Sequence, residues 1–186
     1  MNYQIIHVME EYDEDLDQML FYLPLAGSAF KKVYYDENLQ RAVSKFVAPE
    51  DLIVPYYTTD LESCPRITHV IKMPENEVKK LQSIGFYRNV RVADGNSSSD
   101  TSGVKEEIER LEGMEPSYDT GEVSNLYEVH CNLDLEGFED VNEDDEYTEV
   151  KLPYIVTIDS NSENILAIRR NFEEDDPMKN KIEYFV

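Results

Sequence analysis

The sequence AFKKVYYDENLQRAVSKFV, residues 29–47, contains two runs rich in valine, phenylalanine and tyrosine, Ala29–Tyr35 and Arg41–Val47. A short, mainly polar segment, Asp36–Leu39, lies between them. Two such runs joined by a few turn-forming residues are typical of a β-hairpin. We therefore predict that these residues form two antiparallel strands.

The residues before the hairpin, 2–26, have apolar side chains at helical spacing. Asp13 is suited to the N-cap of a helix, because its carboxylate can accept hydrogen bonds from the first free N–H groups. Pro24 is expected to interrupt the helix, because proline lacks the N–H group that a helix interior requires. Gly27 is expected to end it.

One face of this helix is predicted to be buried. Leu16, Leu20 and Leu23 fall on the same side at helical spacing. We expect this side to pack on the hairpin, close to Phe30 and Val43. Replacement of Leu20 by alanine should then cost about 2–5 kcal/mol, as is usual for a buried leucine.

The remainder of the chain alternates between strand-like and helix-like patterns. Strands are predicted at 52–54, 66–72, 126–135, 150–158 and 165–172, and helices at 74–84 and 104–111. The predicted fold is thus α+β, with N-terminal helices followed by mostly antiparallel strands with inserted short helices. We predict a single domain over residues 1–186, with a flexible loop at about 93–103, which is almost devoid of apolar residues.

The composition limits the classes of function. The chain has 186 residues and an apolar share of 41%, which is typical of globular proteins. Its 40 acidic and 17 basic residues give a net charge of −23. Affinity for nucleic acid comes mainly from lysine and arginine side chains that neutralise phosphates, so we expect that this chain does not bind DNA directly. No apolar run is long enough for a membrane span, and no signal segment begins the chain.

No pattern of catalytic or ligand-binding residues is present, and we predict no catalytic, cofactor-binding or metal-binding residues and no enzymatic activity. The glycine-rich loops that bind phosphates are missing from the sequence. His7, His69 and His130 are isolated, so half-buried packing is favoured over a metal trio assembled by the fold. Cys64 and Cys131 are expected to be free thiols of a reducing compartment, with a single disulfide between them as the alternative.

Three kinds of charged or aromatic cluster remain. The acidic segment 136–149 does not have the spacing of a calcium-binding loop and is interpreted as a solvated connection between strands, with a weak cation site as the alternative. The basic pairs are interpreted as ordinary solvated faces, and the tyrosine pairs as core or subunit packing rather than nucleobase platforms. The basic pairs are Lys31-Lys32, Lys79-Lys80 and Arg169-Arg170. The tyrosine pairs are Tyr34-Tyr35 and Tyr56-Tyr57.

Several longer strings resemble the portal proteins of tailed bacteriophages and prophages, in particular the wing region. They include DQMLFYLPLAGSAFKKVYY at 17–35, FVAPEDLIVP at 46–55, LPYIVTI at 152–158 and the segment 169–177. The similarity covers nearly the whole chain except the loop at 93–103. It implies a structural subunit of a ring at the capsid vertex through which DNA is packaged and ejected. It also implies neighbouring portal subunits, the terminase, and capsid and tail proteins as partners, and a location in the virion.

The resemblance further implies a piece of a longer protein, since members of this family are several times longer. The chain also begins in a helix and ends in the apolar run 182–186, which we interpret as the limits of an excised domain. Such a fragment is expected to be monomeric in isolation. Two alternatives stay open: an acidic binding protein, such as a DNA mimic, and a hydrolase with an unrecognised carboxylate site.

Overall fold

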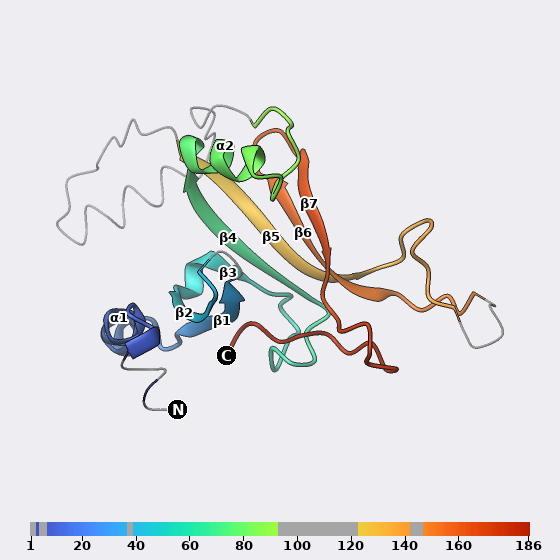
Figure 1. The fold of residues 1–186 in the computed structure, drawn as a ribbon. Coiled ribbons are helices and arrows are strands. Elements are labelled where there is room, and N and C mark those ends of the chain that lie inside the picture. Colours follow the sequence, from blue (N-terminus) through green and yellow to red (C-terminus); the bar gives the residue numbers. More distant parts are fainter. Residues whose placement is uncertain (1–2, 4–6, 37–38, 93–122, 142–146) are drawn as a thin grey trace. The chain divides into compact units, whose positions relative to one another are not determined.

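The computed structural model describes residue 3 and residues 7–36, 39–92, 123–141 and 147–186, which form an α+β fold (Figure 1). The elements in chain order are helix α1 (Tyr12–Ala26), strands β1 (Phe30–Asp36) and β2 (Arg41–Val47), the short 3-10 helix η2 (Pro49–Asp51), strands β3 (Leu52–Ile53) and β4 (Arg66–Pro74), helix α2 (Glu75–Ser83), and strands β5 (Val123–Leu133), β6 (Leu152–Asp159) and β7 (Ile165–Arg170). The predicted fold class is confirmed. The loop predicted at 93–103 and the helix predicted at 104–111 lie outside the described residues.

The strands form two sheets. In the first, β1 and β2 pair antiparallel, with Phe30 opposite Val47 and Asp36 opposite Arg41, so the predicted hairpin is confirmed. In the second, five strands are neighbours in chain order, β3-β4-β5-β6-β7, and β3 pairs antiparallel with β4. Helix α2 lies in the connection between β4 and β5.

The boundaries of α1 differ in part from the prediction. The helix starts at Tyr12 after Glu11, and no side chain caps it, so Asp13 belongs to its first turn and is not the N-cap. Pro24 lies within the helix, which continues to Ala26, and the expected interruption is wrong. The lost N–H bond falls in the last turn, where few bonds remain to be made. Gly27 ends the helix as predicted: its φ of 77° is left-handed, and its N–H donates to the Leu23 oxygen at 2.9 Å.

The predicted packing face of α1 is wrong. Leu20 is 56% exposed, and Leu23 is exposed as well. The half-buried positions are instead Tyr12, Asp15, Leu16, Met19 and Tyr22. The helix is therefore rotated about its axis relative to the expectation, with part of the leucine stripe in solvent.

Polar and aromatic contacts hold α1 in this orientation. The Arg41 guanidinium forms an ion pair with Glu11 at 2.6 Å, and both side chains are largely buried. Asp15 accepts a hydrogen bond from the backbone N–H of Phe46 at 3.3 Å. The rings of Tyr22 and Phe46 lie 5.4 Å apart. The two polar contacts with β2 pair groups that would otherwise lack a partner, and the ring contact adds apolar burial, which together fix the side of α1 that faces β2.

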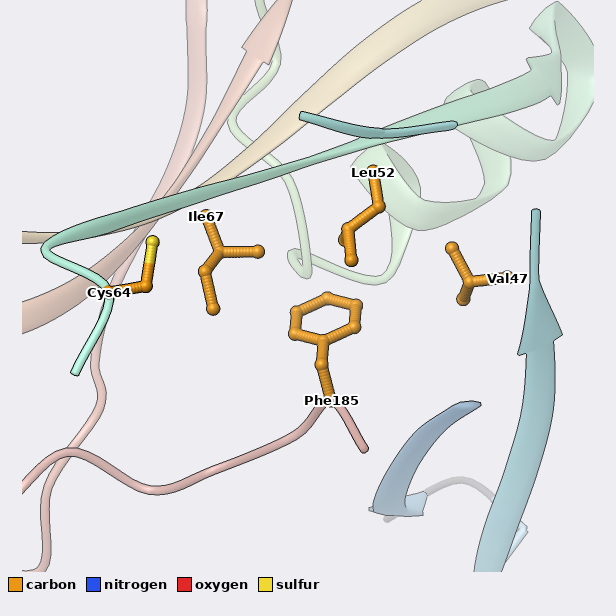
Figure 2. Packing of buried hydrophobic residues seen from close by; sticks show 5 residues of the cluster. All are labelled: Val47, Leu52, Cys64, Ile67 and Phe185. Atoms are coloured by element: carbon orange, nitrogen blue, oxygen red, sulfur yellow. The ribbon is translucent and has the colours of Figure 1, made fainter. Parts of the chain in front are cut away.

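Two compact units are distinguished along the chain. The first comprises Met1–His69, His130–Tyr154 and Arg170–Val186, and the second Val70–Val129 and Ile155–Arg169. The core of the first unit consists of Val47, Leu52, Cys64, Ile67 and Phe185. Figure 2 shows the Phe185 ring in the middle of this cluster, facing Leu52, with Val47 on one side and Ile67 and Cys64 on the other.

The last residues of the chain extend the hairpin of the first unit. The N–H groups of Lys31 and Val33 donate to the backbone oxygens of Val186 and Tyr184, at 2.8 and 2.7 Å. The Val186 N–H returns a bond to the Lys31 oxygen at 2.9 Å. This antiparallel pairing places Phe185 in the core, so the outer edge of β1 is covered.

The second unit has its own apolar core. Its buried members come from α2, the following segment, β5 and β7, and they are Val78, Tyr87, Leu126, Leu166 and Ala167. Burial raises the pKa of the Tyr87 hydroxyl, and the nearby carboxylate of Glu128 acts in the same direction. Among the described residues, no helix is long and apolar enough to cross a membrane.

Candidate functional site

A cavity of about 230 Å³ lies within the first unit. Its wall is formed by the segment that precedes β4, the end of β5 and the segment that leads to the C-terminus. The polar side chains among its lining residues include Cys64, His130, Asn171 and Lys181. The described structure brings several functional groups together here.

Lys181 is held by neutral partners. Its ammonium donates to the backbone oxygens of Leu61 at 2.9 Å and Cys64 at 3.3 Å. These two bonds connect residues more than a hundred positions apart, so they fix the wall of the cavity. Carbonyl oxygens carry no net charge, so the positive charge of Lys181 is not neutralised. The pKa of the Asp60 carboxyl is lowered mainly by hydrogen bonds from Ser63, and the charge of Lys181 adds to this effect.

Asn171 is 2% exposed and links neighbouring segments through its backbone. Its N–H donates to the Pro153 oxygen at 3.0 Å, and its own oxygen accepts from the Ile182 N–H at 2.9 Å. The side-chain Oδ1 is buried and has no hydrogen-bond partner among the described residues. The residue therefore mainly connects neighbouring segments through its backbone hydrogen bonds.

Two of the three histidines meet at one aromatic ring. The imidazoles of His69 and His130 lie edge-on to the Phe185 ring, with centroid separations of 5.7 and 5.2 Å, and His130 also contacts Tyr184. His7 instead lies against Tyr3. The described ranges contain no group of three or more histidine, cysteine or acidic side chains placed to hold a metal ion.

Both cysteines are free thiols that line the cavity. The buried Cys64 thiol donates to the Arg66 oxygen at 3.0 Å and contacts the Thr58 hydroxyl. Burial raises the pKa of the half-buried Cys131, against an opposing effect of Arg66. A raised pKa keeps a thiol protonated at neutral pH, and a protonated thiol is a poor nucleophile.

The described part of the acidic segment 136–149 makes contacts of its own. The Asp140 carboxylate accepts hydrogen bonds from the Lys179 ammonium and, at 2.7 Å, from the Thr148 hydroxyl. The bond from Lys179 is the main reason why the pKa of Asp140 lies below its ordinary value. Residues 142–146 lie outside the described part of the chain, so the cation-site alternative stays a prediction.

The basic pairs have separate partners. Lys31 lies over the Tyr12 ring, Lys79 pairs with Glu75, and Arg170 pairs with Glu174. Arg169 differs from these pairs, because its guanidinium stacks on the Phe86 ring with 3.5 Å between its central carbon and the ring centroid.

The tyrosine pairs do not belong to the core. Tyr35, Tyr56 and Tyr57 are exposed, so the core part of their interpretation is wrong. All three are absent from both buried clusters, while Tyr34 is half-buried in β1. Packing against another subunit stays a prediction for them.

The outward side of α1 carries large exposed apolar side chains, and the spacing of the leucines did not predict which of them face outward. Opposite the half-buried positions lie Leu20, Phe21 and Leu25, of which Phe21 is 70% exposed. Phe21 and Leu25 are four positions apart and therefore neighbours on this side of the helix, while Leu20 lies about 100° around the axis from Phe21. The signal in the sequence is that apolar residues occupy nearly every position from Met19 to Leu25, so one side must face outward.

Comparison with protein-family models and with curated proteins finds no match for this chain in either.

Proposed function

We propose that the chain is a structural subunit of the portal ring of a tailed bacteriophage or prophage, and that it corresponds to part of the wing. In this role it serves DNA packaging, terminase docking and tail attachment within the virion, and performs no chemistry of its own. Its partners are neighbouring portal subunits and the terminase, capsid and tail proteins. The chain is then one part of a longer polypeptide.

The observation that carries the proposal is the exposed apolar side of α1. Leu20, Phe21 and Leu25 leave most of their apolar surface in water in the isolated chain, although burial of that surface would be favourable by about 25 cal/mol per Å². A group of large apolar side chains exposed together marks an interaction surface. These residues also lie within the longest string that carries the resemblance to portal proteins, residues 17–35.

The cavity in the first unit is compatible with a structural role. Lys181 and Asn171 are engaged mainly with backbone groups, and the two cysteines favour the protonated form or are buried. An active site, by contrast, typically holds an activated nucleophile with a base within hydrogen-bond reach. The groups in this cavity instead connect segments of the chain.

Immunogold labelling of particles tests the proposal. Antibodies against this chain are applied to intact and to detergent-opened particles released by cells that carry the gene. Label at one vertex of each opened particle, next to the tail, is the expected result. Label at every vertex, or no copy of the chain in purified particles, contradicts the proposal. An antibody against the major capsid protein serves as the positive control.

A further inference from the structure

Charge is distributed unevenly between two exposed surfaces of the chain. Helix α1 contains four acidic residues and no basic one. The stretches 84–92 and 164–170 contain four arginines and no acidic residue, within a chain whose net charge is −23. Like charges repel across most of any contact between two copies, so these stretches are where attraction is available.

The arginine-containing stretches form one continuous surface. The Arg88 N–H donates to the Leu166 oxygen at 2.8 Å, and the Asn164 amide donates to the Arg91 oxygen at 3.0 Å. Arg169 donates to the Phe86 oxygen at 2.9 Å and stacks on the Phe86 ring. Residues 86–91 thus run alongside β7. We call this the arginine surface and define it by its exposed side chains: Ile84, Phe86, Arg88, Arg91 and Arg169.

The outward side of α1 has the complementary character. Its first half presents the exposed carboxylates of Asp13, Glu14 and Asp17. Its second half presents Leu20, Phe21 and Leu25, as described above. We call these six residues the helix surface. Asp15 does not belong to it, because its carboxylate is turned toward Phe46.

We infer that the helix surface of one copy of this chain docks on the arginine surface of the next copy. Carboxylates would meet guanidinium groups, which form the strongest charge-assisted hydrogen bonds, while the leucines and Phe21 would cover the apolar side chains around Phe86. The two surfaces are different, so the contact is head-to-tail, and repetition of such a contact produces a ring when the rotation closes. This inference rests on the proposed function and names the surfaces that serve it.

A second copy of the chain is a better occupant than nucleic acid. Duplex DNA would have to approach a chain that carries −23 charges in order to reach a few arginines, and the overall field opposes that approach. Nucleic acid also offers nothing to cover the outward side of α1. A second copy supplies the acidic and the apolar partner in one contact.

Disulfide trapping between two variants, each with one exposed cysteine, tests the contact. Leu20→Cys and Ile84→Cys are each made in a Cys131→Ser background; Cys64 is buried and stays in place. The two variants are mixed in equal amounts under mild oxidation. We expect disulfide-linked heterodimers to form faster than either homodimer, because a head-to-tail contact brings position 20 of one copy to position 84 of the other. Faster Leu20→Cys homodimers would overturn the inference.

Charge variants with a matched control show whether the arginines contribute to the contact between copies. Arg88→Glu with Arg91→Glu in the Ile84→Cys copy should slow heterodimer formation about tenfold, which corresponds to about 1.4 kcal/mol of association free energy. Asp13→Lys with Asp17→Lys in the other copy should restore the rate. Lys45→Glu with Lys151→Glu changes the net charge equally at exposed positions outside the arginine surface and should slow it far less. An equal loss in this control contradicts the contact.

Two further outcomes are decisive. If Leu20→Cys links as fast to Ile53→Cys, an exposed position outside the arginine surface, the contact is non-specific and the inference is wrong. If duplex DNA binds the chain and Arg88→Glu with Arg91→Glu abolishes that binding, the surface belongs to nucleic acid and the inference is likewise wrong. Particles labelled at one vertex without this cross-link would refute only the contact, and the cross-link without such particles would refute only the portal role.

Discussion

Phe185 holds the core of the first unit together. Its side chain is 6% exposed, lies among Val47, Leu52 and Ile67, and contacts the imidazoles of His69 and His130. Phe185→Ala should lower the free energy of unfolding by about 3–5 kcal/mol, because a large buried ring is lost and a cavity remains.

The matched control for this variant is Phe21→Ala, which removes the same ring from a 70% exposed position. It should cost under about 0.5 kcal/mol, the level of ordinary surface changes. Both values come from chemical denaturation. Similar losses in the two variants would mean that the C-terminal residues do not complete this core.

Asp140 gives a prediction on pH. Its pKa is lowered by the hydrogen bond from the Lys179 ammonium and, next, by that from the Thr148 hydroxyl. Because the pKa of Asp140 is lower in the folded state than in the unfolded state, its ionised carboxylate stabilises the fold at every pH above the unfolded-state pKa. This stabilisation is lost as the pH falls through the lowered folded-state pKa. Lys179→Met should therefore raise the pKa of Asp140 toward its ordinary value, as followed by NMR of the carboxyl carbon. Lys151→Met, the control, should leave it in place.

At the scale of the element, the end of α1 depends on one backbone conformation. Gly27 has a φ of 77°, and no heavy atom lies within 4 Å of the place where a Cβ would sit. Gly27→Ala should therefore cost about 1 kcal/mol for the left-handed backbone alone, with no steric clash. Gly27→Asn should cost less, since asparagine adopts this conformation more readily. If alanine and asparagine are equal in chemical denaturation, the helix end has shifted.

Most elements could be predicted because their signals are local. The hairpin β1-β2 follows from its β-branched and aromatic runs, and α2 follows from Pro74, the acids after it and Gly85. The packing side of α1 could not be predicted, because it depends on partners such as Arg41 and Phe46 that leave no periodic pattern in the helix. Leu20→Ala is accordingly expected to cost under about 0.5 kcal/mol rather than the loss typical of a buried leucine.

The candidate site was less predictable than the fold. Its wall joins Lys181 to Leu61 and brings the C-terminal residues beside β1, contacts that span well over a hundred positions. A sequence pattern reports neighbours within a few residues, so such contacts have no local signature. The arginine surface is an intermediate case: its lack of acidic residues is visible in the sequence, but the pairing of 86–91 with β7 is not.

At the scale of the molecule, strands β4 and β5 are neighbours although residues 75–122 separate them in sequence. The core of the second unit likewise joins Val78 and Tyr87 to Leu126 and Leu166. A protease site inserted within 93–103 should therefore yield, after cleavage, two fragments that elute together in size-exclusion chromatography without denaturant, because strand pairing and this core join residues on both sides of the cut. Fragments that separate and stay folded would contradict the single-domain prediction.

The net charge of −23 predicts the state of the isolated chain. Self-repulsion opposes stable assembly, and the contact inferred above is a single one. Sedimentation at physiological salt should therefore show mainly monomer. A stable closed ring from this chain alone would contradict this expectation.

The most direct test of the portal assignment is the mass of the particle formed by the full product of the gene's open reading frame, measured by native mass spectrometry and imaged by electron microscopy. The proposal predicts a closed ring of identical subunits around a central channel, with the segment described here in the wing. A product that stays monomeric or dimeric at every concentration and salt tested would contradict it.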